Sequence, residues 1–345
     1  MGSPSGGGCG IEKKTGGGKM TAKENLLAMY GHKMIEIMPV FGEGEFCVYP
    51  VNGFHERPPY NEGGRDWFGC LWEYCDSAMA PAPDPHEHVL EDICDWRKLV
   101  KFPDLDAWDW EKAAREDHVA DADRENQMVN VVVLIGLFER LHVLMGFEEA
   151  LCALVTDPEE VEAFFDVMTD FKIKLIGKLA QYYKPDLITF HDDWGTQRGP
   201  FFAPELWRRL IKPRMKRIID AAHGHGILFL MHSCGKYDEI VPDIAEIGVD
   251  TLQCMDIMDI GKLLEEDGGR MSFQVSVHSQ DFESRDGAGI LREEIVRSTV
   301  EKEFREWGST GWYFPCIFPP SKWYEKTVYE TYLKVREELA GTYTR

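Results

Sequence analysis

The sequence lacks any apolar run long enough to cross a bilayer. Its longest apolar runs, such as Val131 to Phe138, fall far short of the roughly 20 residues that a membrane-spanning helix needs. Basic side chains are also scarce, because 60 acidic residues stand against 38 basic ones and the formal net charge is −22. Such a charge opposes the counterion release that drives binding to nucleic acid and to anionic membranes. We expect a cytoplasmic protein that binds neither.

Two further patterns are missing. No secretory segment precedes the nine cysteines and no small-domain framework surrounds them, so we expect reduced thiols, some of which are metal ligands. No GxGxxG fingerprint follows an early strand, which argues against an open, doubly wound dinucleotide fold. Residues 1–19 are rich in glycine and almost free of apolar side chains, so we interpret them as a disordered leader or an artificial addition. We expect residues 20–345 to form a single domain.

From residue 128 onward, β-branched runs alternate with long amphipathic segments, as in parallel βα units. With one earlier run, the predicted strands are residues 35–41, 129–135, 186–192, 226–232, 249–255, 271–278 and 311–317. Asp157 and Pro158 predict the start of a helix, and Pro213 should divide another one. Seven strands suggest a (β/α)8 TIM-like barrel whose eighth strand lies in an irregular N-terminal extension within residues 20–127. An open sheet is the alternative.

Catalytic groups gather at the carboxyl ends of parallel strands in either architecture, which directs attention to His232 and Cys234. These two residues end a predicted strand, and residues two apart on a strand share a face. Cys316 ends the last predicted strand and should reach the same rim. One histidine and two cysteines would leave a fourth position open on a catalytic zinc ion. A bare HxC pattern is common by chance, however, so these spacings alone leave the metal open.

Other polar and aromatic residues are also expected near the carboxyl ends of the predicted strands. His191 and Asp193 end the strand at 186–192 and are the candidate catalytic residues, although a helix-capping role fits an aspartate there equally well. Single aromatic residues are more often core than pocket. The candidate substrate-pocket residues are Glu43, Trp67, Trp194, Gln253, His278 and Trp312.

Residues 185–253 resemble the uroporphyrinogen decarboxylase superfamily, in particular its corrinoid-dependent methyltransferase branch. The most specific part is HSCG followed by IVPDIAEIGVDTLQ. In that branch an HxC pair and a distant cysteine bind zinc, and the matching residues here are His232, Cys234 and Cys316. The DDWG stretch matches the active-site strand of the family, which supports Asp193.

The resemblance implies a zinc-dependent transfer of a methyl group between a small substrate and a corrinoid (cobalamin) carried by a partner protein, since this chain has no DxHxxG pattern. A methoxyaromatic or another O- or N-methyl donor is favoured, and a thiol acceptor would reverse the direction. Two alternatives remain. A metal-free decarboxylase would need an arginine-bearing, glycine-rich segment, but Arg57 and Arg65 stand in a different setting. A non-catalytic zinc protein would close the site with His191 or Glu43. The sequence also leaves open whether the protein forms a homodimer.

Overall fold

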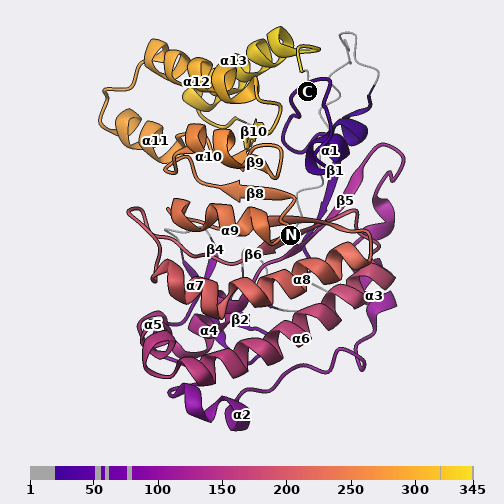
Figure 1. Ribbon diagram of the computed structural model, residues 1–345, viewed down its shortest axis with the longest axis vertical. Helices are drawn as coiled ribbons and strands as arrows, with labels where there is room; N and C mark the ends of the chain where they lie inside the picture. Colours follow the sequence, from indigo (N-terminus) through magenta and orange to yellow (C-terminus); the bar gives the residue numbers. More distant parts are fainter. Residues whose placement is uncertain (1–19, 51–55, 59–61, 76–79, 319, 344–345) are drawn as a thin grey trace.

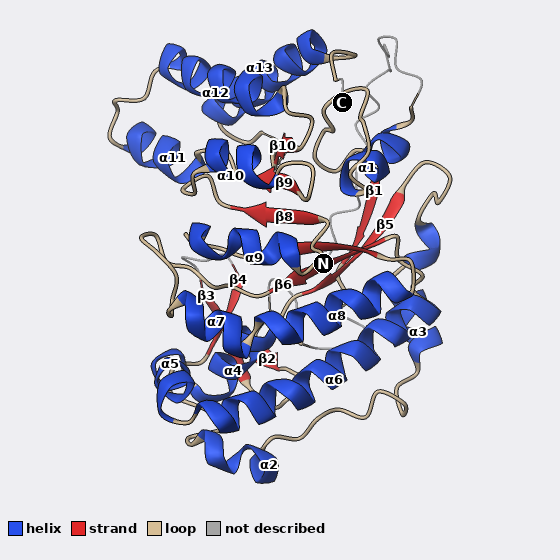
Figure 2. Cartoon of the chain, in the orientation of Figure 1, coloured by secondary structure: helices blue, strands red, loops and turns tan. Residues whose placement is uncertain are grey.

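The computed structural model describes residues 20–50, 56–58, 62–75, 80–318 and 320–343. Its centre is a seven-stranded parallel sheet in which the strands follow one another in chain order, β1-β5-β6-β7-β8-β9-β10 (Figure 2). The predicted leader at residues 1–19 lies outside the described residues. The sheet consists of β1 (Glu45–Val48), β5 (Met128–Val133), β6 (Leu187–His191), β7 (Leu228–His232), β8 (Thr251–Cys254), β9 (Ser272–Val275) and β10 (Tyr313–Pro315).

Helices connect consecutive strands, so the chain is a series of βα units (Figure 1). The break predicted at Pro213 occurs two residues before it, at Ile211, where one helix has ended at Leu210 and the next begins at Lys212. The helices are α1 (Ala22–Tyr30), α2 (Trp96–Leu99), α3 (Trp110–Glu116), α4 (Leu137–Met145), α5 (Phe147–Thr156), α6 (Pro158–Tyr182), α7 (Pro204–Leu210), α8 (Lys212–Gly224), α9 (Val241–Glu246), α10 (Ile260–Asp267), α11 (Ser279–Gly287), α12 (Glu293–Gly308) and α13 (Trp323–Leu339), with 3-10 turns at Ile93–Asp95, Val119–Asp121 and Asp238–Ile240.

A curled parallel sheet in chain order, with helices between the strands, confirms the α/β class and the TIM-barrel type. Every strand predicted from residue 129 onward is present. Within the described residues the ladders run from β1 to β10, and an eighth parallel strand is not among them. None of the helices in this part of the chain is long and apolar enough to span a membrane.

The expected first strand at residues 35–41 is wrong. This segment has irregular backbone, and β1 begins only at Glu45. Pro39 gives one reason, because proline lacks the N–H that an inner strand must donate. The Pro39 carbonyl instead accepts a hydrogen bond from the hydroxyl of Tyr332 on α13. Ile35, Met38 and Val40 of this segment are buried, and its backbone is hydrogen-bonded to the last helix.

The N-terminal extension forms a second, antiparallel sheet of β2 (Gly64–Arg65), β3 (Leu71–Cys75) and β4 (Ala80–Pro83). Two ion pairs with buried side chains fasten this region to the helices of the main domain. Arg140 of α4 binds Asp66 at 2.6 Å, and Lys172 of α6 binds Glu56. The expected irregular extension is thus an ordered element anchored by desolvated charge.

Breaking one of these pairs should be costly. We expect Lys172→Met to lower the free energy of unfolding by about 3 kcal/mol or more, because Glu56 would remain as a buried charge without its partner. Lys174→Met is the matched control, since Lys174 lies on the same helix and pairs with Asp106 at an exposed site. Its loss should cost at most about 1 kcal/mol. Urea denaturation measures both, and equal costs would contradict the assignment.

Candidate active site

A row of polar side chains crosses the sheet near its carboxyl end. His191 on β6 is the aligned partner of His232 on β7, His232 is aligned with Gln253 on β8, and Gln253 with Gln274 on β9. Aligned residues of neighbouring parallel strands present their side chains on the same face. The two imidazole rings are therefore stacked, with centroids 3.9 Å apart and an interplanar angle of 17°.

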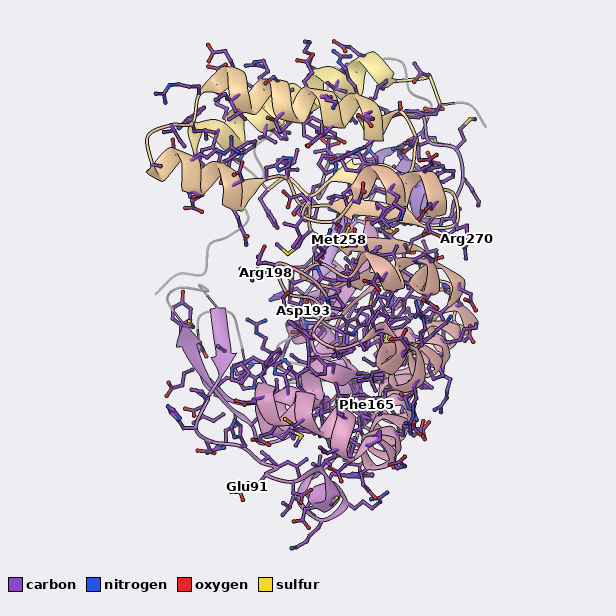
Figure 3. The ribbon with its side chains drawn as sticks, turned by 60° about the vertical axis from the view of Figure 1, so that its left-hand side comes forward. Glu91, Phe165, Asp193, Arg198, Met258 and Arg270 are labelled. Carbon is purple, nitrogen blue, oxygen red and sulfur yellow. The ribbon has the colours of Figure 1, made fainter. Side chains whose placement is uncertain are left out.

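The loop after β7 brings the predicted thiol to this row. The Nε2 atom of His232 lies 3.3 Å from Sγ of Cys234. The Oδ1 atom of Asp193 accepts a hydrogen bond from the backbone N–H of Cys234 at 2.6 Å and lies 3.9 Å from Nε2 of His232. Figure 3 shows Asp193 near Arg198, toward the side of the molecule where the antiparallel sheet lies. Imidazole, thiol and carboxylate thus meet at the ends of two adjacent strands.

Two carboxyl groups support the row from the side of α4. Asp192 is fully buried and accepts hydrogen bonds from the backbone N–H groups of Phe138 and Glu139, at the start of α4, and from the indole of Trp194. Glu139 binds Nδ1 of His191 at 3.1 Å. The sequence reasoning missed Glu139. Its position three residues after Gly136, at the start of a helix that follows a strand, is a signal that could have found it.

Burial controls the protonation of these groups. It lowers the pKa of His232 to about 3, with a further contribution from the neighbouring ring of His191. Burial also raises the pKa of the Cys234 thiol, and the Asp193 carboxylate adds to this effect. Burial and the Asp193 charge raise the pKa of Glu139 well above its usual range. Burial therefore favours the uncharged forms of the His232 imidazole, the Cys234 thiol and the Glu139 carboxyl group.

The predicted metal ligands are brought together only in part. Among the described residues, His191, Asp193 and His232 form a group whose ligand atoms all lie within 4.8 Å of one another. Neither predicted cysteine ligand belongs to that group: Cys234 contacts His232, and Cys316 follows β10. Burial and the charge of Glu45 raise the pKa of the Cys316 thiol to about 12.

Two of the predicted pocket residues, Trp194 and Gln253, contact other side chains of the protein on this side of the sheet. Trp194 is fully buried and packs against Trp207 and Tyr237, and its contact with substrate stays a prediction. Gln253 belongs to the polar row, where its Oε1 atom lies 2.5 Å from Nδ1 of His232.

The other predicted pocket residues lie in different settings. Glu43 precedes β1 and Trp312 precedes β10, so both lie at the amino edge of the sheet, opposite the site, because the strand at 35–41 was wrongly placed and Trp312 was assigned to the wrong end of its strand. Trp67 packs against neighbouring tryptophans in the N-terminal extension. His278 follows β9 and forms ion pairs with Asp256 and Glu303.

The turn after Cys234 depends on two glycines in contact. Gly235 has φ +87°, and a Cβ there would meet the backbone of Gly195 at 2.1 Å. We expect Gly235→Ala to lower the free energy of unfolding by about 2 kcal/mol or more, through strain and overpacking. Gly199→Ala, with open space around its added methyl, should change it by less than about 0.5 kcal/mol. Thermal and urea unfolding compare the two, and an equally small effect of Gly235→Ala would refute the close approach.

The ion pairs of His278 should make stability depend on pH. Hydrogen bonds that its ring donates to Asp256 and Glu303 raise the pKa of His278 from 6.5 to about 10. A raised folded-state value gives stability that is complete below pH 6.5 and is lost as the pH rises toward 10. The wild type should therefore have a higher free energy of unfolding than a His278→Gln variant at pH 6. This difference should fall by at least about 1 kcal/mol between pH 6 and pH 10. A constant or growing difference across that range would contradict this.

Known proteins that are similar to this chain point to a family. Residues 122–277 match the family model described as uroporphyrinogen decarboxylase (URO-D). A curated relative, the methylated-thiol–coenzyme M methyltransferase of Methanosarcina mazei, is 28% identical over 107 residues, which are 31% of this chain and 28% of the relative. The match therefore spans under a third of that protein's length.

A solved structure agrees with the fold. A methyltransferase from Methanosarcina mazei superposes with a TM-score of 0.66, at 15% sequence identity, over 93% of this chain and 99% of that one. The described sheet, the family match and these two similarities are in accord with the resemblance seen in the sequence. Residues 122–277 are therefore similar to the uroporphyrinogen decarboxylase family, and the chain shares the fold of a methyltransferase.

Proposed function

We propose that this protein is a zinc-dependent methyltransferase that moves a methyl group between a small substrate and a corrinoid protein. The observation that carries the proposal is the contact of His232 with Cys234, 3.3 Å apart, beside Asp193 at the carboxyl ends of β6 and β7. The two similar proteins named as methyltransferases support methyl transfer.

The donor set fits zinc. His232 is neutral, which is the form that binds a metal, and Cys234 offers a soft sulfur ligand next to it. Cys316 is proposed as the third ligand, and this requires its sulfur to approach the pair. When bound, zinc would supply a Lewis acid that polarises the heteroatom beside the transferred methyl group.

Side chains of this protein can donate or accept the proton that the reaction transfers. Burial and the charge of Asp193 raise the pKa of Glu139, which favours its protonated form, and this carboxyl group faces Nδ1 of His191. As a methyl ether is cleaved, the other ring nitrogen of His191 gives its proton to the departing oxygen, and Glu139 passes its proton to Nδ1. Asp193 holds the Cys234 loop through the backbone N–H. His191 and Asp193 are thus proposed as catalytic residues.

An aromatic wall beside the site favours an aromatic methyl donor. Phe138 packs against Phe202 at 5.0 Å between ring centroids, and Phe147 packs against Phe201 at 5.0 Å. The backbone N–H of Phe138 binds Asp192, which links this wall to the polar row. Phe147 remains 44% exposed, so the wall has a face that a planar ring can cover. A methoxyaromatic fits this chemistry better than a small thiol, the substrate class in the name of the curated relative.

The first experiment measures zinc in the purified protein and in a Cys316→Ala variant, and then assays demethylation of methoxyaromatics with a reduced corrinoid protein by absorption spectroscopy. We expect about one zinc ion per chain, with both zinc and demethylation strongly reduced in the variant. Cys152→Ala is the matched control, because Cys152 is an exposed thiol on α5, and it should keep both properties.

The outcomes separate the parts of the proposal. Absence of zinc from the carefully prepared wild type would overturn the metal assignment. Zinc without demethylation of any methoxyaromatic, but with methylation of a thiol by the methylated corrinoid protein, would reverse the proposed direction. Zinc retained in full by Cys316→Ala would remove Cys316 from the ligand set.

A further inference from the structure

The polar row continues behind His232 as a chain of two side-chain amides. Gln253 places its Oε1 atom 2.5 Å from Nδ1 of His232. The Nε2 group of Gln253 donates a hydrogen bond to Oε1 of Gln274 on the next strand. Gln274 is only 2% exposed, so this second amide lies away from solvent. The chain runs from the interior of the barrel to the ring that faces Cys234.

The chemistry of an amide makes this chain directional. One end of a glutamine amide only donates hydrogen bonds and the other end only accepts them. Because the Nε2 group of Gln253 donates to Gln274, the Oε1 atom of Gln253 must face His232. A carbonyl oxygen can only accept, so Nδ1 of His232 must carry the ring proton. The Nε2 atom is then left with a lone pair, and it is the atom that lies 3.3 Å from Cys234.

We infer that Gln253 and Gln274 are positioning residues that fix His232 in the Nδ1–H tautomer, with Nε2 available to a metal ion. The inference rests on the proposed metal site but says which groups prepare it. It also gives Gln253 a role other than substrate contact, since both ends of its amide are occupied inside the row. Groups behind a ligating histidine commonly set its tautomer and change metal affinity by about 10–100-fold.

The same strands provide a matched control. Thr251 and Ser272 lie two residues before the two glutamines, on β8 and β9, and their hydroxyl groups are 2.7 Å apart. This pair is buried and polar but does not bond to His232 in the described contacts. Removing it tests the cost of losing any polar contact between β8 and β9, without changing the row.

The experiment compares Gln274→Met, Gln274→Glu and Ser272→Ala with the wild type. Zinc affinity is measured by competition with a chelator, and the tautomer by the ¹⁵N chemical shifts of the His232 ring in metal-free protein, assigned with His232→Gln. In Gln274→Met the amide of Gln253 is free to turn, so we expect a mixture of tautomers and zinc binding weaker by about 10-fold or more. Gln274→Glu keeps an acceptor, so it should retain the Nδ1–H form and near-normal affinity, as should Ser272→Ala.

Each result decides a different point. A Gln274→Met variant with wild-type tautomer and wild-type zinc affinity would overturn the inference. Equal weakening in Ser272→Ala and Gln274→Met would also overturn it, because the effect would then be one of general packing. If the wild type binds no zinc, the proposed function fails. The ring shifts of the metal-free protein still test the tautomer in that case.

Discussion

The register of four parallel strands is the constraint on which the site depends. Because β6, β7, β8 and β9 are aligned residue for residue, His191, His232, Gln253 and Gln274 form one row across the sheet. A shift by one residue would turn each of these side chains to the opposite face. The stacked rings and the amide chain follow from this alignment, which the apolar side chains of the intervening positions enforce by their burial.

The loops above the row are held by close contacts of the backbone. Gly136 lies against Asp192, and a Cβ at that position would meet the aspartate side chain at 2.3 Å. Gly235 and Gly195 approach one another in the same way. Such contacts leave no room for side chains, so the three loops after β5, β6 and β7 can share one compact edge. The buried carboxyl group of Asp192 accepts hydrogen bonds from the start of α4. It therefore links the loop after β6 to the loop after β5.

The sequence predicted much of this because its signals were local. Strands from residue 129 onward, the helix start at Pro158 and the break near Pro213 all follow from short-range patterns of apolar residues and proline. The run at 35–41 failed because its backbone is bonded to a helix almost 300 positions away, which no local pattern reveals. The pairing of His232 with Cys234 was predictable from a spacing of two residues. Glu139 was missed because its contact with His191 joins positions 52 residues apart.

Charge explains why these donors suit a cation. Asp193 lies beside the pair of His232 and Cys234, and burial together with the charge of Asp193 raises the pKa of the Cys234 thiol. A divalent cation would change this balance, because it compensates a thiolate and a carboxylate at once. The chain as a whole carries a net charge of −22, so its mean field favours cations and repels polyanions. A polycarboxylate substrate would meet that repulsion, whereas an uncharged methyl ether would not.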